Sequence, residues 1–431
     1  MENTSRRRLA LSLPYVIMFA VNLAFLVFAF AFEDPASIYN GFIRIILSRS
    51  ILITDYIAIG GLGATLVNVA IAGLASLIML IISRIKPSGA VIMALWLTAG
   101  FAFFGKNVFN MIPLTIGVWA YSKFKKEPFS NYTLASLLVA TLSPIISEMS
   151  FFGAMSLPIE VAIGVLIGFG VGFIFPPITA HMVRMHSGYD LYSMGFAGGL
   201  IATIIASIIK SMGYDIIPVY EMSSGNNTII AIMLYTISVA LLCCGLLAGG
   251  ENSVIVRIRK NLGEYPKFFK HSGRLITDFY FLYSNSIYIN MGLLCAFATT
   301  VVLLLGAEFS GIVIAGVLTI VGFGCFGKHP KNVTPVMIGA FLSALLNKWE
   351  LTCPQNVAAI LFSTALAPMA GQFGWLWGIV SGFLHVCIAM FVGELNGGLN
   401  LYNNGFSAGL VAMFLLPVIH VSKRMRIDHE D

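Results

Sequence analysis

Two lysines stand in nearly the same phrase, and both phrases lie inside apolar sequence. Lys106 belongs to FGKNVFNMIP, and Lys328 belongs to FGKHPKNVTP, 222 residues further along the chain. An ammonium group in apolar surroundings is costly unless it has a partner, so an ionisable residue there is a candidate functional residue. The repeated phrase predicts two related sites, each suited to an anion or to the carbonyl oxygen of a neutral solute.

The neighbours of each lysine predict a broken membrane helix. A glycine precedes the lysine, an asparagine follows, and a proline comes three residues later, where it suits the first turn of a new helix. The N-terminus of such a half-helix offers free N–H groups and partial positive charge. The predicted binding positions are Gly105, Lys106, Asn110, Pro113, Gly327, Lys328, Asn332 and Pro335. An ordinary hairpin, with both lysines reaching the headgroups from its tip, is the alternative, and simple packing is a third interpretation.

Gapless alignment indicates that the chain is an internal duplication. Residues 89–117 and 311–339 share twelve identities in twenty-nine positions, and residues 188–202 and 398–412 share eight in fifteen. Identical glycine, lysine, asparagine, proline and tyrosine positions in a fixed order are hard to produce by chance in two apolar helices.

The second aligned pair, residues 188–202 and 398–412, and one charged residue inside an apolar run add further candidate pathway residues. Tyr192 and Tyr402 open the two copies of a small-residue stretch, which favours either a pore lining or close helix packing. Glu148 lies inside an apolar run, where a carboxyl group could carry protons or accept bonds from an amide. Gln372 is its counterpart in the second copy.

Composition identifies an all-α polytopic membrane protein. The chain has 431 residues, of which 58% are hydrophobic and 10% charged, a balance that soluble domains do not have. About fourteen apolar segments follow one another, and the segments at 89–104, 108–122, 311–326 and 334–347 are too short to cross a bilayer. The net charge of +6 comes from clusters between apolar runs, which indicates orientation in a membrane and not nucleic-acid binding.

The basic clusters predict which ends face the cytoplasm. They include Arg6, Arg7 and Arg8, then Lys123, Lys125 and Lys126, then the stretch from Arg257 to Arg274, and finally Lys423, Arg424 and Arg426. Both termini are therefore expected on the cytoplasmic side of the cell membrane. We place the segment with Arg44 and Arg49 on the outer side of the membrane. The two copies of the lysine phrase then enter the membrane from opposite sides, which predicts two inverted structural repeats with broken or re-entrant half-helices.

We expect four regions along the chain. Residues 1–38 form an N-terminal transmembrane helix, 39–227 the first repeat, 228–280 a connecting transmembrane helix with a basic cytoplasmic linker, and 281–431 the second repeat. The expected partners are the lipid bilayer and a small solute, and a homo-oligomer is compatible with this architecture. The six cysteines show no CxxC spacing, so no metal or other cofactor is expected.

The chain resembles a bacterial family of membrane proteins of unknown function that carries this region as a tandem pair. More distantly, its layout is similar to that of urea transporters, which also have two inverted halves, an asparagine–proline phrase and a later L-Y-G-[FY]-N-like phrase. The matching positions are Asn110, Pro113, Gly117, Tyr192, Gly195 and Phe196, then Asn332, Pro335, Gly339, Tyr402, Gly405 and Phe406. Here two residues separate the asparagine from the proline, and FAFFGK and GCFGK stand where that family has Gln or Glu.

The sequence predicts passage of a small polar solute, such as a small anion, through an inverted-repeat channel or carrier. A urea-channel-like facilitator of neutral amides is the alternative that the resemblance implies. A non-transporting scaffold or receptor is the alternative of another class. No catalytic cluster is evident, so we do not expect an enzyme.

Overall fold

The structure is a computed structural model that describes residues 12–51, 54–217, 220–251, 253–275 and 277–427, with side chains as far as residue 422. The described chain is helical apart from one isolated bridge between Thr54 and Glu221, which confirms the predicted all-α class. The basic residues Arg6, Arg7 and Arg8, and the side chains of Lys423, Arg424 and Arg426, lie outside the described part.

Ten helical stretches of the described residues are long and apolar enough to span a membrane, which confirms a multi-pass membrane protein. They are α2 (Leu13–Phe32), α5 (Leu62–Ile82), the stretch Phe129–Ser150, α10 (Leu157–Met185), α11 (Ser193–Ser211), α12 (Asn227–Leu247), the stretch Phe279–Leu304, the stretch Pro354–Phe373, α20 (Trp375–Asn396), and Asn403–Ser422 of α21 (Asn403–Ile427).

Other helices are short or segmented. The lysine phrases connect α6 (Gly89–Phe101) to α7 (Val108–Phe124) and α16 (Gly311–Phe323) to α17 (Pro330–Leu346). Three of the spanning stretches are segmented and contain the helices α8 (Thr133–Leu138), α9 (Ser143–Ser150), α14 (Phe279–Tyr283), α15 (Ile287–Leu304), α18 (Pro354–Phe362) and α19 (Ala367–Phe373). The remaining helices are α3 (Pro35–Leu47), α4 (Tyr56–Gly60) and α13 (Val254–Glu264).

Residues 50–83 are one nearly continuous apolar run in the sequence, but the structure divides this run. Asp55 caps α4, because its Oδ1 accepts the N–H of Ile57 at 2.9 Å, and Gly61 then turns the chain at a φ of 92° before α5 begins. A positive φ suits glycine, which has no Cβ to clash with the following carbonyl group. Local capping therefore overrides the continuous hydrophobic pattern here.

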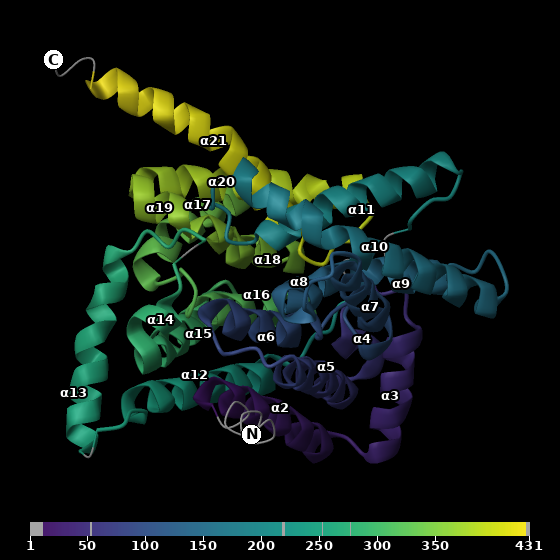
Figure 1. Cartoon of the computed structure of the whole chain (residues 1–431), viewed down its shortest axis with the longest axis horizontal. Helices are drawn as coiled ribbons and strands as arrows, with labels where there is room; N and C mark the ends of the chain where they lie inside the picture. The colour runs from purple at the N-terminus through teal and green to yellow at the C-terminus, as the bar shows by residue number, and fades with distance from the viewer. Residues whose placement is uncertain (1–11, 52–53, 218–219, 252, 276, 428–431) are drawn as a thin grey trace.

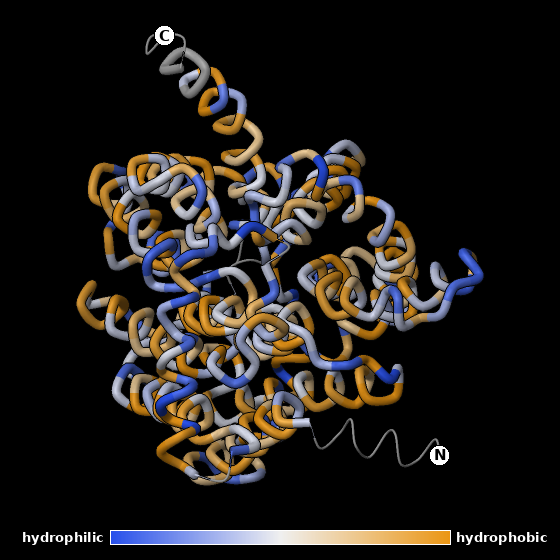
Figure 2. Tube along the Cα trace, turned by 60° about the vertical axis from the view of Figure 1, so that its left-hand side comes forward, coloured by the Kyte–Doolittle hydropathy of each residue, from blue (hydrophilic) through white to orange (hydrophobic). Residues whose placement is uncertain are grey.

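The helices form a bundle with two helices lying across its ends. Figure 1 shows α2, α5 and α12 side by side, with α3 crossing one end of them and α13 crossing the other. Figure 2 shows hydrophobic sequence over most of the bundle and hydrophilic stretches at helix ends and connections. This distribution fits spans that cross a bilayer and two helices that lie along its surfaces.

The centre of the bundle is an antiparallel pair, α6 and α16. A Cβ on Gly100 would lie 3.1 Å from the Cα of Ala315, so the backbones are in close contact there. Gly89 at the start of α6 lies against the end of α16, and Gly311 at the start of α16 lies against the Phe103 carbonyl group beyond the end of α6. Each helix has 13 residues, so each is about 20 Å long, less than the ~30 Å hydrocarbon core.

A second seam joins α11 to α21 through glycines and aromatic rings. A Cβ on Gly199 would overlap the ring of Phe406, and a Cβ on Gly409 would overlap the ring of Phe196. The two phenylalanine rings stack with their centroids 5.9 Å apart. Equivalent positions of the two sequence copies therefore contact each other across this seam, as small residues allow in membrane proteins.

The glycine seam gives the first testable prediction. We expect Gly199→Ala to lower the free energy of unfolding by about 1–3 kcal/mol, because the new methyl group overpacks the seam against Phe406. Gly170→Ala is the matched control. It lies in α10, where a new Cβ would meet no atom within 4 Å, so helix propensity should keep or raise stability by up to ~1 kcal/mol. Thermal unfolding midpoints in detergent test both, and equal effects of the two substitutions would contradict the packing argument.

Candidate solute-binding site

Each lysine phrase forms a buried break between two helices. Gly105 has a φ of 78° and Gly327 a φ of 99°, conformations that favour glycine. The lysines that follow them are buried, with 1% of Lys106 and none of Lys328 exposed. The structure therefore does not place the lysines at an exposed hairpin tip, and both ammonium groups are bonded inside the protein.

Asparagines from neighbouring helices hold the backbone of each break. The side-chain amide of Asn68 in α5 donates to the carbonyl oxygens of Ala102 at 2.8 Å and of Lys106 at 2.9 Å. Asn290 in α15 makes the two equivalent bonds at the second break, at 2.6 and 2.7 Å. Backbone that is broken inside a membrane protein needs such partners, because no water is there to bond it.

A second asparagine bonds each break from its own phrase. The Asn110 amide donates to the Gly105 carbonyl oxygen at 2.9 Å, and Asn332 does the same for Gly327 at 2.9 Å. Asn110 also shares a capping box with Asn107, in which each side chain accepts the other's backbone N–H. The amide group is suited to this position because it donates and accepts at once.

The second half-helices begin slightly earlier than the sequence predicts. The predicted starts lie near Asn110 and Asn332, but these residues occupy the third position of α7 and α17, because each bonds back to the residue that caps its helix. Pro113 and Pro335 consequently lie inside the helices and not in the first turn. Pro113 packs against Gly168 of α10, where only a glycine leaves room for the ring.

Lys328 has two hydrogen-bond partners among the described residues. Its Nζ donates to the hydroxyl of Tyr192 and, at 2.7 Å, to that of Thr364, and it lies 4.4 Å from the Tyr192 ring centroid. Asp190, two residues before Tyr192, is buried, and its Oδ1 accepts the backbone N–H of Tyr192 at 2.7 Å. The Oδ2 of Asp190 has no hydrogen-bond partner in the described structure. Lys328 is thus bonded to two hydroxyl groups, with a buried acid in the same region of the chain as Tyr192.

Lys106 has only one partner among the described residues, and that partner is neutral. Its Nζ donates to the hydroxyl of Thr98 at 3.1 Å. The sequence explains the difference, because Asn400 and Ala140 stand at the positions equivalent to Asp190 and Thr364. An ammonium group can donate three hydrogen bonds, so Lys106 keeps two of them unused.

Two tyrosine rings lie between the breaks. The centroids of Tyr192 and Tyr402 are 4.5 Å apart, and each ring also lies 5.0 Å from a phenylalanine that precedes a break, Phe323 or Phe101. The hydroxyl of Tyr402 is buried without a hydrogen-bond partner in the described structure. The structure therefore brings both predicted tyrosines to the breaks and leaves one hydroxyl unused.

Glu148 and its predicted counterpart Gln372 differ in burial. Glu148 is buried and forms an ion pair with Arg49, whose Nε lies 2.8 Å from its Oε2. Arg49 precedes Ser50, whose carbonyl group lies against Gly105, so this ion pair is next to the first break. Gln372 is exposed, although the preceding Gly371 packs against Ser272, whose carbonyl oxygen accepts a bond from the Asn332 amide.

A cavity of ≈ 690 Å³ with several polar side chains lies at the start of α16. One wall includes Ile312, which follows Gly311 at the end of α16 that lies against the first break, and another includes Asn403, which follows Tyr402. The charged or amide side chains that line the cavity are Lys348, Glu350, Gln355, Glu394, Asn403 and Asn404. The cavity is large enough for a small organic solute, whose sites typically enclose about 300–1,000 Å³.

Several of these residues were not predicted from the sequence. Asn68 and Asn290 lie 222 residues apart, the same offset as the two lysines. This shared offset could have identified them as equivalent residues of the two copies. The sequence signal for Asp190 was an acidic residue within an apolar run, aligned with Asn400 in the second copy. No sequence signal pointed to Thr98, because its equivalent in the second copy is Ile320.

A protein family described as "Protein of unknown function (DUF1576)" matches the chain twice, over residues 34–211 and 258–421. No curated protein and no solved structure matches the chain. Each of the two matched regions contains one copy of the lysine phrase.

The asparagine bonds give the second prediction. We expect Asn68→Ala and Asn290→Ala each to lower the free energy of unfolding by about 1–3 kcal/mol, because two buried carbonyl groups lose their donor. Asn131→Ala is the matched control, since that amide is exposed and bonds Glu127 at 3.3 Å on the surface. Thermal unfolding in detergent measures the three variants. Unchanged midpoints for Asn68→Ala and Asn290→Ala would show that the breaks do not depend on these bonds.

Proposed function

Because the chain belongs to the DUF1576 family, whose function is unknown, we propose its function from the geometry: it moves a small polar solute, in the first place a small anion, across a membrane. The observation that carries this proposal is the buried ammonium group of Lys106, which has one neutral partner. A buried charge of this kind is costly unless a ligand compensates it. An anion that enters the first break would do so.

The surroundings of Lys106 support an anion with two acceptor oxygens. The ammonium group has unused donors, and the buried hydroxyl of Tyr402 has no partner in the described structure. A carboxylate accepts hydrogen bonds at both of its oxygens, and bonds between a cation and an anion are the stronger kind. Formate, acetate and lactate are therefore the first solutes to test, and their transport involves no chemical change of the solute.

The cavity supports a route to this position. It is lined by elements of the second sequence copy, namely the start of α16 and parts of α18, α20 and α21, together with Tyr220. We place its mouth at the outer surface and both chain termini in the cytoplasm of a cell, following the distribution of basic residues. Inverted repeats would let the two halves exchange roles, so that the pathway opens alternately to each side.

The polar groups near the breaks have supporting roles in this proposal. Lys328 is bonded to two hydroxyl groups, so we assign it, together with the buried Asp190, to the framework of the second break and not to solute binding. Glu148 has Arg49 as a partner, so we assign it to positioning of the first break, next to Ser147, which accepts a bond from the Asn110 amide at 2.9 Å. This assignment replaces the expected proton-carrier role of Glu148.

Neutral amides are a second candidate class of solute. The amide side chains of Gln355, Asn403 and Asn404 in the cavity wall could exchange hydrogen bonds with urea or acetamide. The urea-transporter-like layout of the sequence favours the same class. The two candidates differ in their requirement for Lys106, since a neutral amide gains much less from an ammonium group than an anion does.

Flux measurements on reconstituted protein give the third prediction. We expect liposomes with the wild-type chain to take up formate, acetate or lactate faster than urea, acetamide or glycerol. Lys106→Met should lower anion flux at least about tenfold, because a charge-assisted hydrogen bond is worth about 1.5–3 kcal/mol. Lys331→Met is the control, since Lys331 is exposed and follows the second break. Fast flux of neutral amides that survives Lys106→Met would favour the second candidate instead.

A fourth prediction uses the difference between the two breaks. Asn400→Asp places an acid at the position equivalent to Asp190, where its carboxylate should attract the Lys106 ammonium group. We expect anion flux to fall at least about fivefold, because the new charge competes with the solute anion for this group. The unfolding midpoint should fall as well, because the Gly195 carbonyl oxygen loses the Asn400 amide as its donor. Asn396→Asp, in a buried position at the end of α20, is the matched amide-to-acid control. Unchanged anion flux in Asn400→Asp would contradict the role of an uncompensated Lys106.

A further inference from the structure

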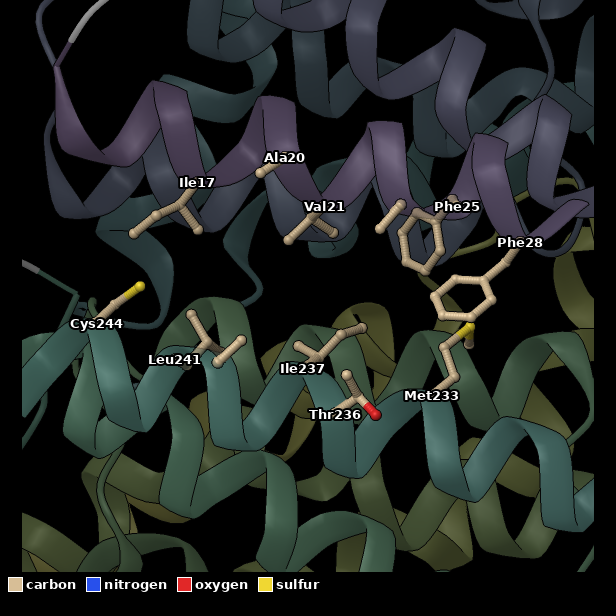
Figure 3. A pocket seen from close by; sticks show the side chains of 12 residues that line it. Ile17, Ala20, Val21, Phe25, Phe28, Met233, Thr236, Ile237, Leu241 and Cys244 are labelled. Atoms are coloured by element: carbon tan, nitrogen blue, oxygen red, sulfur yellow. The ribbon is translucent and has the colours of Figure 1, made fainter.

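An apolar groove separates α2 from α12 on the side of the bundle. Figure 3 shows Ile17 opposite Cys244 at one end of the groove and Phe28 beside Met233 at the other. The cavity measures ≈ 200 Å³, and nearly all of its lining is hydrocarbon, with Thr236 and Cys244 as the exceptions. Both helices are membrane-spanning stretches, so the groove faces the acyl-chain region of the bilayer.

An amphipathic helix crosses the end of this groove. Helix α13 follows α12 after a short connection and lies across its end in Figure 1. Its apolar side chains are exposed, including 77% of Ile255, and Val254, Val256 and Leu262 share this property. A helix with exposed apolar side chains and several basic residues is typical of the membrane–water interface.

Basic side chains lie at the same end. Arg257 donates to the carbonyl oxygen of Leu247, the last residue of α12, at 3.0 Å, and this residue is one turn beyond Cys244 in the groove. The Nε of Arg257 is buried without a partner in the described structure. Lys260 is paired with Glu251 at 2.5 Å, and this hydrogen bond lowers the pKa of the Glu251 carboxyl. Arg259 is exposed, and Arg257, which also lies near the Glu251 carboxylate, is partly exposed.

The opposite end of the bundle has no comparable basic surface among the described residues. Helix α3 lies there in Figure 1, and its one basic residue, Arg44, donates to the carbonyl oxygen of Ile59 at 2.9 Å. The stretch 250–274 holds six basic and two acidic residues. Of the two helices that lie across the ends of the bundle, α13, next to the groove, therefore belongs to the more basic segment.

We propose that an anionic phospholipid binds at this end, with one acyl chain in the groove between α2 and α12 and its phosphate on Arg257, while Arg259, on another face of the same helix, adds positive charge nearby. A hydrocarbon chain is the occupant that a lipid-facing apolar groove takes from the bilayer. Clusters of lysine and arginine beside a membrane span attract anionic headgroups, and arginine binds phosphate oxygens in a bidentate manner. This site is separate from the breaks and does not depend on the solute.

Native mass spectrometry of the full chain in detergent tests the site. The protein is incubated with equal amounts of dioleoyl phosphatidylglycerol and dioleoyl phosphatidylcholine, and bound lipids are counted by mass. We expect one retained phosphatidylglycerol with a preference of at least about fivefold, since each basic residue near a membrane contributes about that factor. Arg257→Gln with Arg259→Gln should bring the preference close to one.

Two further variants distinguish the contribution of the lipid headgroup from that of the acyl chain. Ala20→Phe, at an exposed position of the groove, should reduce retention of both lipids, because its ring fills the space of the chain. The control replaces another exposed basic cluster, Lys123, Lys125 and Lys126, by glutamine and should leave the preference unchanged. A wild-type chain without preference, an equal loss in the control, or full retention in Ala20→Phe would each overturn the proposal.

Discussion

Backbone that is broken inside a membrane protein needs hydrogen-bond donors for its carbonyl groups, and the centre of this molecule is arranged around that need. The breaks follow helices of 13 residues and lie buried in the bundle. Side-chain amides from Asn68, Asn110, Asn290 and Asn332 satisfy three carbonyl groups in each break. Without these donors neither lysine could be held away from the membrane surface.

The two halves also stabilise each other's central helix. Asp278 of the second half accepts the N–H of Gly89 at 2.9 Å, at the start of α6. Asp55 of the first half lies at the start of α16, beside Gly311. An acid at a helix N-terminus is favourable because the first N–H groups lack partners and carry partial positive charge. Each half is consequently incomplete without the other, which explains why the antiparallel pair lies at the centre.

Much of the framework could be predicted from the sequence, because it depends on hydrophobic spacing and on repeated residues. The spans, the short helices and the two lysines follow from patterns that a single chain displays twice. The bonds from Lys328 to Tyr192 and Thr364 could not be predicted, because they depend on how distant segments pack. The same is true of Arg49 with Glu148. Helix α13 was not predicted, because its basic residues were interpreted only as an indication of membrane orientation. Its apolar residues nevertheless recur at helical spacing.

Near-symmetry makes small differences between the halves informative. A duplicated framework gives both lysines the same backbone environment, so their chemistry is set by a few neighbours that differ. Tyr192 and Thr364 bond one ammonium group, whereas the other has Thr98 alone among the described residues, with Asn400 and Ala140 at the positions of Asp190 and Thr364. The seams around them are closed by glycines and rings with little free space. Any relative motion of the halves must therefore occur as rigid bodies along these seams, and the weakly held lysine is the one whose bonds such a motion can exchange most easily.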